Sequence, residues 1–507
     1  MSRIKKILVA NRGEIAIRVF RTCRDLGIGA VAVYSDADRT ALHVRMADEA
    51  YRIGPAPSSD SYLAIDAVLD AAARSGADAI HPGYGFLSEN PEFADRCAAQ
   101  GLIFIGPPAS AIKAMGDKAA ARKLMQAAGV PMVPGTIEPV DDAAEALAAA
   151  EDIGFPVLVK AVAGGGGKGM RVVQTSEYLA DSFEAARREA SAAFGDGRLY
   201  IEKYIQEPRH IEFQILADHH GNVVHLFERE CSIQRRHQKI IEECPSCVLG
   251  ESLRDQMGET AVQAALACGY ANAGTVEFLL DDAQNFYFME MNARLQVEHP
   301  VTEAVTGIDL VAEQIRIAEG QPLRLLQDDI EIRGHAIECR IYAEDPCSSF
   351  LPDPGTLVRH RAPAGPRVRV DSGVEEGVDI PIYYDPLIAK VVTWGSDRDQ
   401  AIKTMLRALD EYKISGVRTT IPFCRYVLEH DDFRSGNFST HFVEDRFSPE
   451  ALGQASESES IAAALASVLV GISSTDKSSN GQVTSSDCAS DGGWSPWANR
   501  RGRRVKG

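Results

Sequence analysis

Polar and apolar residues alternate along EMNARLQVEH, residues 290–299. Alternation with a period of two is typical of a β-strand, whose successive side chains point to opposite faces. One face would carry two acids, two amides and a guanidinium within about 13–14 Å, at about 3.3 Å per residue. A strand with one solvated face is the ordinary alternative. We expect a single extended strand with a reactive polar face, formed by Glu290, Asn292, Arg294, Gln296 and Glu298.

A companion acid, Glu277, lies upstream in GTVEFLLDDAQNFYFME, which predicts a strand, a polar turn and a second strand. With a four-residue loop, Asp281 would face Phe286 and Glu277 would face Glu290. Two carboxylates at cross-strand distance repel each other unless a cation lies between them. Oxygen ligands favour magnesium or calcium over zinc, and Asn292 would add a neutral oxygen. The hairpin therefore predicts a metal site, with a repelling surface pair as the alternative.

A run of glycines, GGGGKGM at residues 164–170, follows the apolar segment FPVLVKA. Glycines let backbone amides approach phosphate oxygens closely, and Lys168 adds a positive charge. The run is not the GxxxxGK[ST] phosphate loop, because no Ser or Thr follows the lysine. A flexible hairpin tip is the alternative. Together with Lys160 in the preceding strand and the paired acids, the run indicates a nucleotide site with magnesium at the phosphates.

The N-terminal pattern predicts a strand–helix–strand unit of a parallel sheet. Residues 6–10 are apolar, residues 11–27 form an amphipathic helical pattern, and residues 30–35 are again apolar. Asp36 follows this second strand, where a dinucleotide-binding enzyme would have a ribose-binding acid. The first turn contains only Gly13 and lacks the glycine fingerprint, which argues against a nicotinamide dehydrogenase.

Further along, a helix at residues 141–153 and the glycine run suggest a small lid at about 133–204. The Gly- and Pro-rich segment 350–366 opens a sheet-rich C-terminal region. The pattern of residues 401–414 predicts a late helix. Closure of a lid would exclude water from a reactive intermediate.

Composition agrees with an enzyme of several domains. The chain has 507 residues, 45% hydrophobic and 25% charged, and a net charge of −19. That charge argues against nucleic-acid and anionic-membrane partners. We expect no membrane span, because no apolar run reaches 18 residues, and no signal peptide. The ten cysteines are best interpreted as reduced thiols of a cytoplasmic protein.

Ten segments, in order, carry a resemblance to the ATP-grasp enzymes and, within them, to the biotin carboxylases. The resemblance spans about residues 4–447. It implies an α/β and α+β fold with a Rossmann-like N-terminal domain (1–115), an ATP-grasp domain with a mobile lid (116–330) and a sheet-rich C-terminal domain (331–447). The segments are KILVANRGEIAIRV, HPGYGFLSEN, GDK, GGGGKGM, EKYIQEPRHIEFQ, ERECSIQRRHQKIIEE, EMNARLQVEHPVTE, GHAIECRIYAEDP, FLPDPG and PIYYDPLIAK.

The resemblance implies roles for individual residues. The nucleotide would be bound by Lys118, Lys160, His210, Gln234 and His237, by the lid glycines Gly165 and Gly166, and at the adenine by Glu202 and the backbone of Lys203 and Ile205. Magnesium or manganese would be bound by Glu277, Glu290 and Asn292.

The remaining roles concern bicarbonate and biotin. Arg294, Gln296 and the amide of Val297 would cradle bicarbonate, Glu298 would deprotonate it, and Lys239 would steady carboxyphosphate. Arg340 would stabilise the enolate of biotin's ureido group, with Tyr84 nearby. The structural alternative for Arg340 is an ion pair with Glu338 or Glu344 on a surface strand.

The implied activity is ATP-dependent carboxylation of biotin, with bicarbonate as the carbon source. Biotin on a Met-Lys-Met lysine is not expected within this sequence, whose last methionine is Met405. The expected partners are therefore a separate biotin carboxyl carrier protein and a carboxyltransferase that selects acetyl-CoA, propionyl-CoA or pyruvate; a homodimer is also expected. Two alternatives are another ATP-grasp ligase, such as a carbamoyl-phosphate-forming enzyme, and a catalytically inactive regulatory subunit.

Two features depart from the resemblance. Cys244 and Cys247 form a single CPSC where the family usually has small residues or proline. With no second CxxC, we interpret them as neutral, and we interpret Cys231 as structural. The low-complexity tail, residues 448–507, ends in Trp494 and Trp497 beside five basic residues. Such residues are frequent interface anchors, so partner docking and a disordered extension are both expected possibilities.

Overall fold

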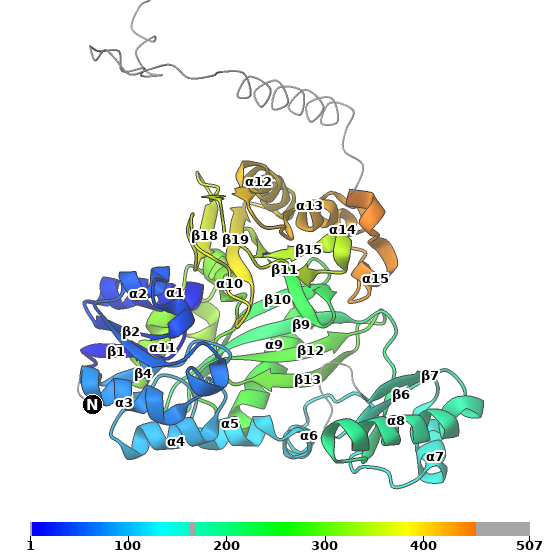
Figure 1. The fold of residues 1–507 in the computed structure, drawn as a ribbon. Helices are drawn as coiled ribbons and strands as arrows, with labels where there is room; N and C mark the ends of the chain where they lie inside the picture. Colours follow the sequence, from blue (N-terminus) through cyan, green and yellow to red (C-terminus); the bar gives the residue numbers. More distant parts are fainter. Residues whose placement is uncertain (1–2, 163–168, 453–507) are drawn as a thin grey trace, which may run out of the picture. The chain divides into compact units, whose positions relative to one another are not determined.

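The computed structural model describes residues 3–162 and 169–452. A parallel five-stranded sheet comes first, in the order β3-β2-β1-β4-β5. The predicted strand–helix–strand opening is confirmed by β1, α1 and β2 (blue in Figure 1). The strands are β1 (Lys6–Val9), β2 (Gly29–Ser35), β3 (Glu49–Gly54), β4 (Ala79–His81) and β5 (Ile103–Phe104), and the helices are α1 (Gly13–Leu26), α2 (Leu42–Met46), α3 (Ile65–Ser75), α4 (Pro91–Ala99) and α5 (Ala109–Gly116).

A continuous eight-stranded antiparallel sheet forms the middle of the molecule, in the order β13-β12-β9-β10-β11-β14-β19-β18. It joins strands from residues 209–292 to strands from residues 335–395, so side chains from both regions face one another across it. Its strands are β9 (Arg209–Ala217), β10 (Val223–Arg235), β11 (Gln238–Cys244), β12 (Asn272–Leu280), β13 (Phe286–Asn292), β14 (His335–Tyr342), β18 (Val368–Ser372) and β19 (Leu387–Gly395).

Helices and two small sheets accompany the large sheet. Helix α9 packs on β9 and β10, and α12, the late helix predicted from the sequence, packs on β14 and β19. The helices are α6 (Lys118–Ala127), α9 (Glu251–Ala267), α10 (His299–Thr306), α11 (Leu310–Ala318), α12 (Arg398–Glu411), α13 (Ile421–Glu429), α14 (Asp431–Ser435) and α15 (Phe442–Arg446). The small sheets pair β15 (Glu344–Asp345) with β16 (Leu351–Pro352), and β17 (Arg359–Arg361) with β20 (Lys413–Ser415).

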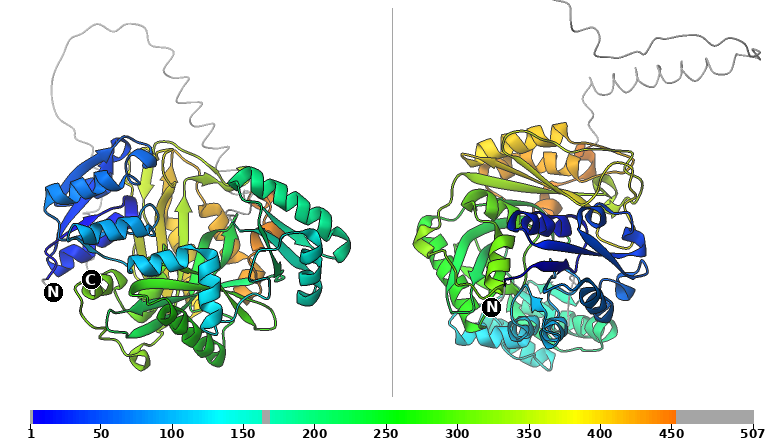
Figure 2. Two further views of the ribbon diagram at one scale, coloured as in Figure 1. Left: turned by 90° about the horizontal axis from the view of Figure 1, so that it is seen from below. Right: turned by 90° about the vertical axis from the view of Figure 1, so that its left-hand side faces the viewer.

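A three-stranded sheet, β7-β6-β8, lies apart from the five-stranded and eight-stranded sheets, at the lower right of Figure 1 and the right of Figure 2's left view. Its apolar side packs on two helices around Phe183, Ala186 and Val159. The glycine run between β6 and β7, including Gly165, Gly166 and Lys168, lies outside the described residues, and lid motion stays a prediction. The elements are β6 (Val157–Ala161), β7 (Met170–Val173), β8 (Leu199–Lys203), α7 (Ala143–Ile153) and α8 (Leu179–Phe194).

The β12–β13 hairpin confirms one predicted pair and corrects another. Glu277 pairs with Glu290 as expected, but Leu280, not Asp281, pairs with Phe286. Asp281 instead closes the loop, since its carboxylate accepts hydrogen bonds from the backbone and side-chain nitrogens of Asn285 at 2.8 and 3.0 Å. A register irregularity between Glu277 and Phe278 compensates for the longer loop and brings the two glutamates opposite each other.

The single strand expected across residues 290–299 is wrong. β13 ends at Asn292, residues 293–298 form a loop, and α10 begins at His299. The Ala293 amide donates to Glu89 Oε1 at 2.9 Å, so a side chain replaces a neighbouring strand as its partner. Leu295 is fully buried in the core that joins α1, β1 and α11, and this burial anchors the loop.

No described helix is long and apolar enough to span a membrane.

Candidate active site

Most of the residues assigned from the sequence line one cavity of about 1270 Å³. The side chain of Lys118, at the start of α6, is not among the described features, and Gly165 and Gly166 lie outside the described residues. The assigned residues that line the cavity are Tyr84, Lys160, Glu202, Lys203, Ile205, His210, Gln234, His237, Lys239, Glu277, Glu290, Asn292, Arg294, Gln296, Val297, Glu298 and Arg340.

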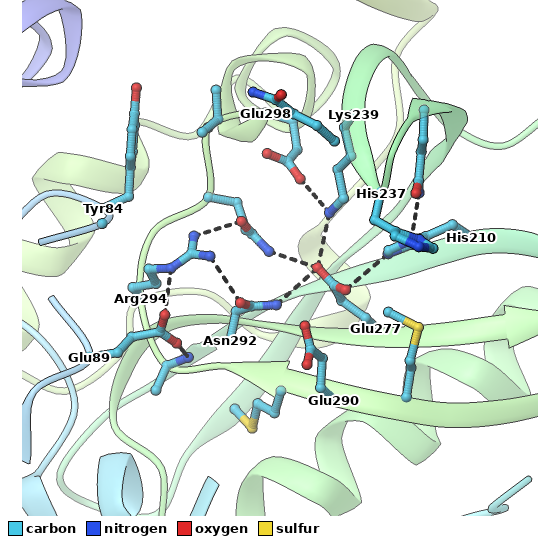
Figure 3. Close-up of a pocket in the computed structure, with 18 of the residues that line it drawn as sticks. Tyr84, Glu89, His210, His237, Lys239, Glu277, Glu290, Asn292, Arg294 and Glu298 are labelled. Carbon is cyan, nitrogen blue, oxygen red and sulfur yellow. Dashed lines mark hydrogen bonds and ion pairs between the residues drawn. The ribbon is translucent and has the colours of Figure 1, made fainter. Parts of the chain in front are cut away.

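Glu277, on β12, lies at the centre of the contacts between the site residues (Figure 3). Its Oε1 accepts hydrogen bonds from Lys239 Nζ, Asn292 Nδ2 and Gln296 Nε2, each at 2.9 Å. Its Oε2 lies 3.0 Å from His210 Nε2. Burial opposes ionisation of Glu277, but Lys239 and His210 outweigh it and hold its pKa below the ordinary value. Glu277 is therefore a buried carboxylate at neutral pH.

Lys239, on β11, joins Glu277 to Glu298, the expected base. Its Nζ lies 2.7 Å from Glu298 Oε1 and also pairs with Glu212. Burial would lower the pKa of Lys239, yet these carboxylates raise it well above the ordinary value. One buried cation thus holds three acids together, and removal of any partner would leave uncompensated charge.

Arg340, on β14, contacts the other carboxylate oxygen of Glu298. Its Nη2 lies 2.9 Å from Glu298 Oε2, and its Nε donates to Glu242 Oε1 at 2.6 Å. The surface pair considered for Arg340 is wrong, because Glu344 pairs with Arg235 and Arg340 is itself buried. Lys239 and Arg340 hold the pKa of buried Glu298 well below its ordinary value, despite desolvation.

Arg294 is held in the loop that follows β13. Its Nη1 donates to Gln296 Oε1 at 2.7 Å and its Nη2 donates to Asn292 Oδ1 at 3.0 Å. Glu89 accepts a hydrogen bond from its Nε at 2.8 Å. Sequence reasoning missed Glu89, which lies 205 positions away, although HPGYGFLSEN contains it.

A divalent cation fits the donor set near Glu277. Glu290 lies across the hairpin from Glu277, and ligand atoms of His210, Glu212 and Glu277 lie within 4.8 Å of one another. Carboxylate oxygens are ligands that magnesium and manganese prefer. Asn292 Oδ1 already accepts from Arg294, so its oxygen has a competing partner. Sequence reasoning missed Glu212, although the alternation His210, Glu212, Gln214 in HIEFQ was available to find it.

The side of the cavity for which the sequence predicts nucleotide binding is formed by the three-stranded sheet and its neighbours. Glu202, on β8, pairs with Arg122 and lies 3.7 Å from Lys160 Nζ. The Lys203 side chain donates hydrogen bonds to the carbonyls of Gly154 and Phe155, so these two contacts hold it against the loop before β6.

Two of the remaining residues assigned to the nucleotide contact each other, and Tyr84 lies on the opposite side of the site from His210 (Figure 3). Gln234 Nε2 and His210 Nδ1 lie 2.8 Å apart. The hydroxyl of Tyr84 donates to buried Glu14. His237 has a positive φ of 65°, at the tight turn between β10 and β11.

The cysteines of interest are free thiols. Cys231 and Cys244 are buried, whereas Cys247 is exposed. Burial raises the pKa of the Cys244 thiol above its usual range, which disfavours the reactive thiolate.

Three regions of the chain match family models. Residues 3–112 match "Biotin carboxylase, N-terminal domain", residues 117–326 match "Carbamoyl-phosphate synthase L chain, ATP binding domain", and residues 338–445 match "Biotin carboxylase C-terminal domain". Fold and site together therefore define an ATP-grasp enzyme.

Curated relatives and solved structures agree. A pyruvate carboxylase subunit of Methanothermobacter thermautotrophicus is 57% identical, over 87% of this chain and 89% of its own length. Biotin carboxylase 1 of Bacillus subtilis is 55% identical, over 87% of this chain and 98% of its own. The biotin carboxylase domain dimer of Hydrogenobacter thermophilus 2-oxoglutarate carboxylase, in complex with MgADP, ADP and bicarbonate, has a TM-score of 0.83 at 50% identity and covers 90% of this chain and 100% of its own. The chain belongs to the biotin carboxylase family.

Proposed function

We propose that this biotin carboxylase uses ATP and bicarbonate to carboxylate biotin held on a separate carrier protein, through carboxyphosphate. The observation that carries the proposal is the row Lys239–Glu298–Arg340, in which a buried carboxylate lies between two cations. A base next to an anion-binding guanidinium and a phosphate-binding lysine suits a reaction in which bicarbonate, carboxyphosphate and the biotin enolate all carry negatively charged oxygens.

In the first half of the reaction, Arg294, Gln296 and the amide of Val297 bind bicarbonate. Glu298 accepts its proton, which the depressed pKa allows because Glu298 is ionised at neutral pH. The bicarbonate oxygen then attacks the terminal phosphate of ATP and displaces ADP, which forms carboxyphosphate. Lys239 moves from the carboxylates to this carboxyphosphate.

The nucleotide is bound by residues of the ATP-grasp region. The resemblance assigns Lys118, Lys160 and His210 to its phosphates, with Gln234 and His237 beside them, and it assigns Gly165 and Gly166 to the lid. Glu202 and the backbone of Lys203 and Ile205 face the adenine. Glu277, Glu290 and Asn292 would hold magnesium or manganese, which when bound neutralises phosphate charge. The MgADP bound in the Hydrogenobacter structure supports a site for a nucleotide with magnesium.

In the second half of the reaction, carboxyphosphate releases carbon dioxide inside the closed site. Phosphate removes the ureido proton of biotin, and Arg340 stabilises the negative charge on the ureido oxygen. The ureido nitrogen then attacks carbon dioxide, which gives carboxybiotin. Tyr84 lines the same cavity as Arg340, which supports a role for Tyr84 near biotin.

The partners are a biotin carboxyl carrier protein and a carboxyltransferase, and the chain works as a dimer in the cytoplasm. The Bacillus relative, matched over 98% of its length, supports a separate carrier, and the dimeric Hydrogenobacter structure supports the dimer. The final acceptor is chosen by the transferase, since relatives of similar identity act in pyruvate and 2-oxoglutarate carboxylases. The tail at 448–507 remains a candidate docking segment.

The test is ADP release by the purified chain with magnesium, bicarbonate and free biotin. Wild-type ADP release should rise with biotin, and Arg340→Ala should lose that rise. Lys403→Ala, an exposed lysine of α12, is the matched control and should behave as wild type.

ADP release that is independent of biotin but requires bicarbonate would favour another ATP-grasp ligase that forms an acyl or carbamoyl phosphate. Repeating the assay with a biotinylated carrier distinguishes that outcome from a chain that accepts biotin only on its partner.

A further inference from the structure

The loop at residues 293–298 needs support from outside itself. It contains the proposed bicarbonate ligands and base, yet it belongs to no helix or strand. Catalytic geometry tolerates little error, so the backbone of such a loop must be held by surrounding groups. Two side chains that play no part in the reaction described above make those contacts.

The first is Lys390, on β19. Its side chain is 0% exposed, and its Nζ donates to the carbonyl of Val297 at 2.8 Å. Its Nζ also lies 3.2 Å from Glu14 Oε1, on α1. Burying a lysine completely costs free energy, even when a carboxylate and one backbone carbonyl are its partners. Packing alone would not require a charged side chain at this position.

The second is His299, the first residue of α10. Its Nδ1 lies 2.7 Å from the carbonyl oxygen of Gln296. Because a carbonyl only accepts, Nδ1 carries the proton. Burial, together with Lys390, Arg18 and Arg369, holds the pKa of His299 well below its ordinary value, so the ring is neutral.

These contacts fall on two successive peptide groups. The carbonyl of Gln296 shares a planar peptide with the amide of Val297, so His299 fixes the direction of that N–H. The carbonyl of Val297 shares the next peptide with the amide of Glu298, so Lys390 fixes the backbone from which the Glu298 side chain leaves. The two donors together determine where the bicarbonate amide and the base point.

We propose that Lys390 and His299 are positioning residues for bicarbonate: they hold the Gln296–Val297 and Val297–Glu298 peptides so that the Val297 amide and the Glu298 carboxylate meet the anion together. The inference rests on the proposed function and extends it.

The same contacts link two substrate positions. Glu14 pairs with Lys390 and also accepts the hydroxyl hydrogen bond of Tyr84, on the biotin side of the cavity. The chain Tyr84–Glu14–Lys390–Val297 therefore crosses from the N-terminal region, through β19, to the bicarbonate loop. Glu14 and Tyr84 line the cavity, whereas Lys390 and His299 support it from behind.

The test compares Lys390→Met with Lys403→Met on an exposed face of α12. Bicarbonate and ADP dissociation constants are measured by calorimetry in the presence of magnesium, alongside the KM for bicarbonate in ATP cleavage. Lys390→Met should weaken bicarbonate binding and raise its KM by about tenfold, the size of a charge-assisted hydrogen bond. Its ADP affinity should stay within about twofold of wild type, as should both constants of Lys403→Met.

A second pair of variants distinguishes a positioning role from a folding defect caused by replacing the buried lysine. His299→Leu should weaken bicarbonate binding, whereas His299→Gln, whose amide can still donate to the Gln296 carbonyl, should restore most of it. Unchanged bicarbonate affinity in Lys390→Met and His299→Leu would overturn the inference. An equal loss of bicarbonate and ADP affinity would also overturn it, because it would show a merely structural role.

The measurements distinguish a failure of the proposed function from a failure of the positioning role. A wild type that binds bicarbonate but shows no biotin-dependent ATP cleavage removes the proposed function, while the dissociation constants still decide the positioning role. A wild type that does not bind bicarbonate overturns both.

Discussion

At the scale of single residues, charge balance explains the site. Lys239 pairs with Glu212, Glu277 and Glu298, three buried acids that would otherwise repel one another. In the proposed reaction, Lys239 would exchange these partners for phosphate oxygens. The cation would then have two functions, to hold the buried acids together and to bind the developing oxyanion.

Replacing Lys239 by Met tests this balance. Without the shared cation, we expect the pKa values of Glu277 and Glu298 to rise, and bicarbonate-dependent ATP cleavage to fall at least about 100-fold, as for loss of one oxyanion donor. ADP release under saturating magnesium measures the effect. Lys113→Met, on an exposed position of α5, is the control; equal loss in both variants would contradict the prediction.

A pH effect is expected from Glu242. Burial raises its pKa to about 7, against the opposing effect of Arg340. Above pH 7 Glu242 is ionised and shares Arg340 with Glu298, whereas below pH 7 it is neutral and Arg340 is drawn to Glu298 alone. The biotin-dependent rate should therefore fall as the pH drops from 8 to 6. Glu242→Gln should lower the rate at pH 8 and abolish this dependence; an unaltered profile in the variant would refute the assignment.

At the scale of elements, helix α7 illustrates how local sequence stabilises the region around the nucleotide. Asp142 caps the helix, with its carboxylate accepting hydrogen bonds from the amides of Ala144 and Glu145 at 2.9 Å each. Helix α7 packs with α8 on the three-stranded sheet and has its own apolar core there. Local stability of this region is thus separable from that of the large sheet.

Removal of the cap should weaken α7 locally. We expect Asp142→Ala to cost about 1 kcal/mol and to lower the hydrogen-exchange protection of the α7 amides about fivefold. Asp142→Asn keeps the side-chain acceptor and should retain most of that protection. Amide exchange followed by mass spectrometry measures both; a protection loss spread equally over the eight-stranded sheet would count against a local effect.

At the scale of the whole molecule, buried neutral histidines affect acid stability. Burial lowers the pKa values of His43, His81 and His225 to about 4. In the unfolded chain the pKa of a histidine is about 6.5. As the pH falls, the unfolded state therefore binds protons before the folded state does. Each histidine therefore contributes stability above pH 6.5 that is lost between about pH 6.5 and 4, up to about 3 kcal/mol.

The melting temperature should accordingly fall as the pH is lowered from 7 to 4.5. His81→Gln, at the end of β4, should reduce this pH dependence, whereas His219→Gln at an exposed position should not. Thermal unfolding followed by circular dichroism at several pH values measures it. Parallel curves for His81→Gln and wild type would contradict the proposed contribution.

The sequence by itself determined the chemistry and the local geometry of this protein. Alternation and turn composition depend on neighbouring residues, so the β1–α1–β2 opening, the α12 helix and the Glu277–Glu290 pair could all be predicted. The motif resemblance added the residues that line the cavity. The hairpin register between Asp281 and Phe286 could not be predicted, because a strand irregularity costs little and leaves no pattern in the sequence.

Only the tertiary structure decided which distant groups complete the site. Glu89, Glu212 and Glu242 come from other strands and loops, and Lys390 reaches Val297 from 93 positions away. The periodicity of the sequence does not predict such partners, because the order of strands in the sheet, not spacing along the chain, brings them together. Residues 293–298 form a loop rather than a strand for the same physical reason: side chains from distant elements satisfy the backbone that a neighbouring strand would otherwise pair.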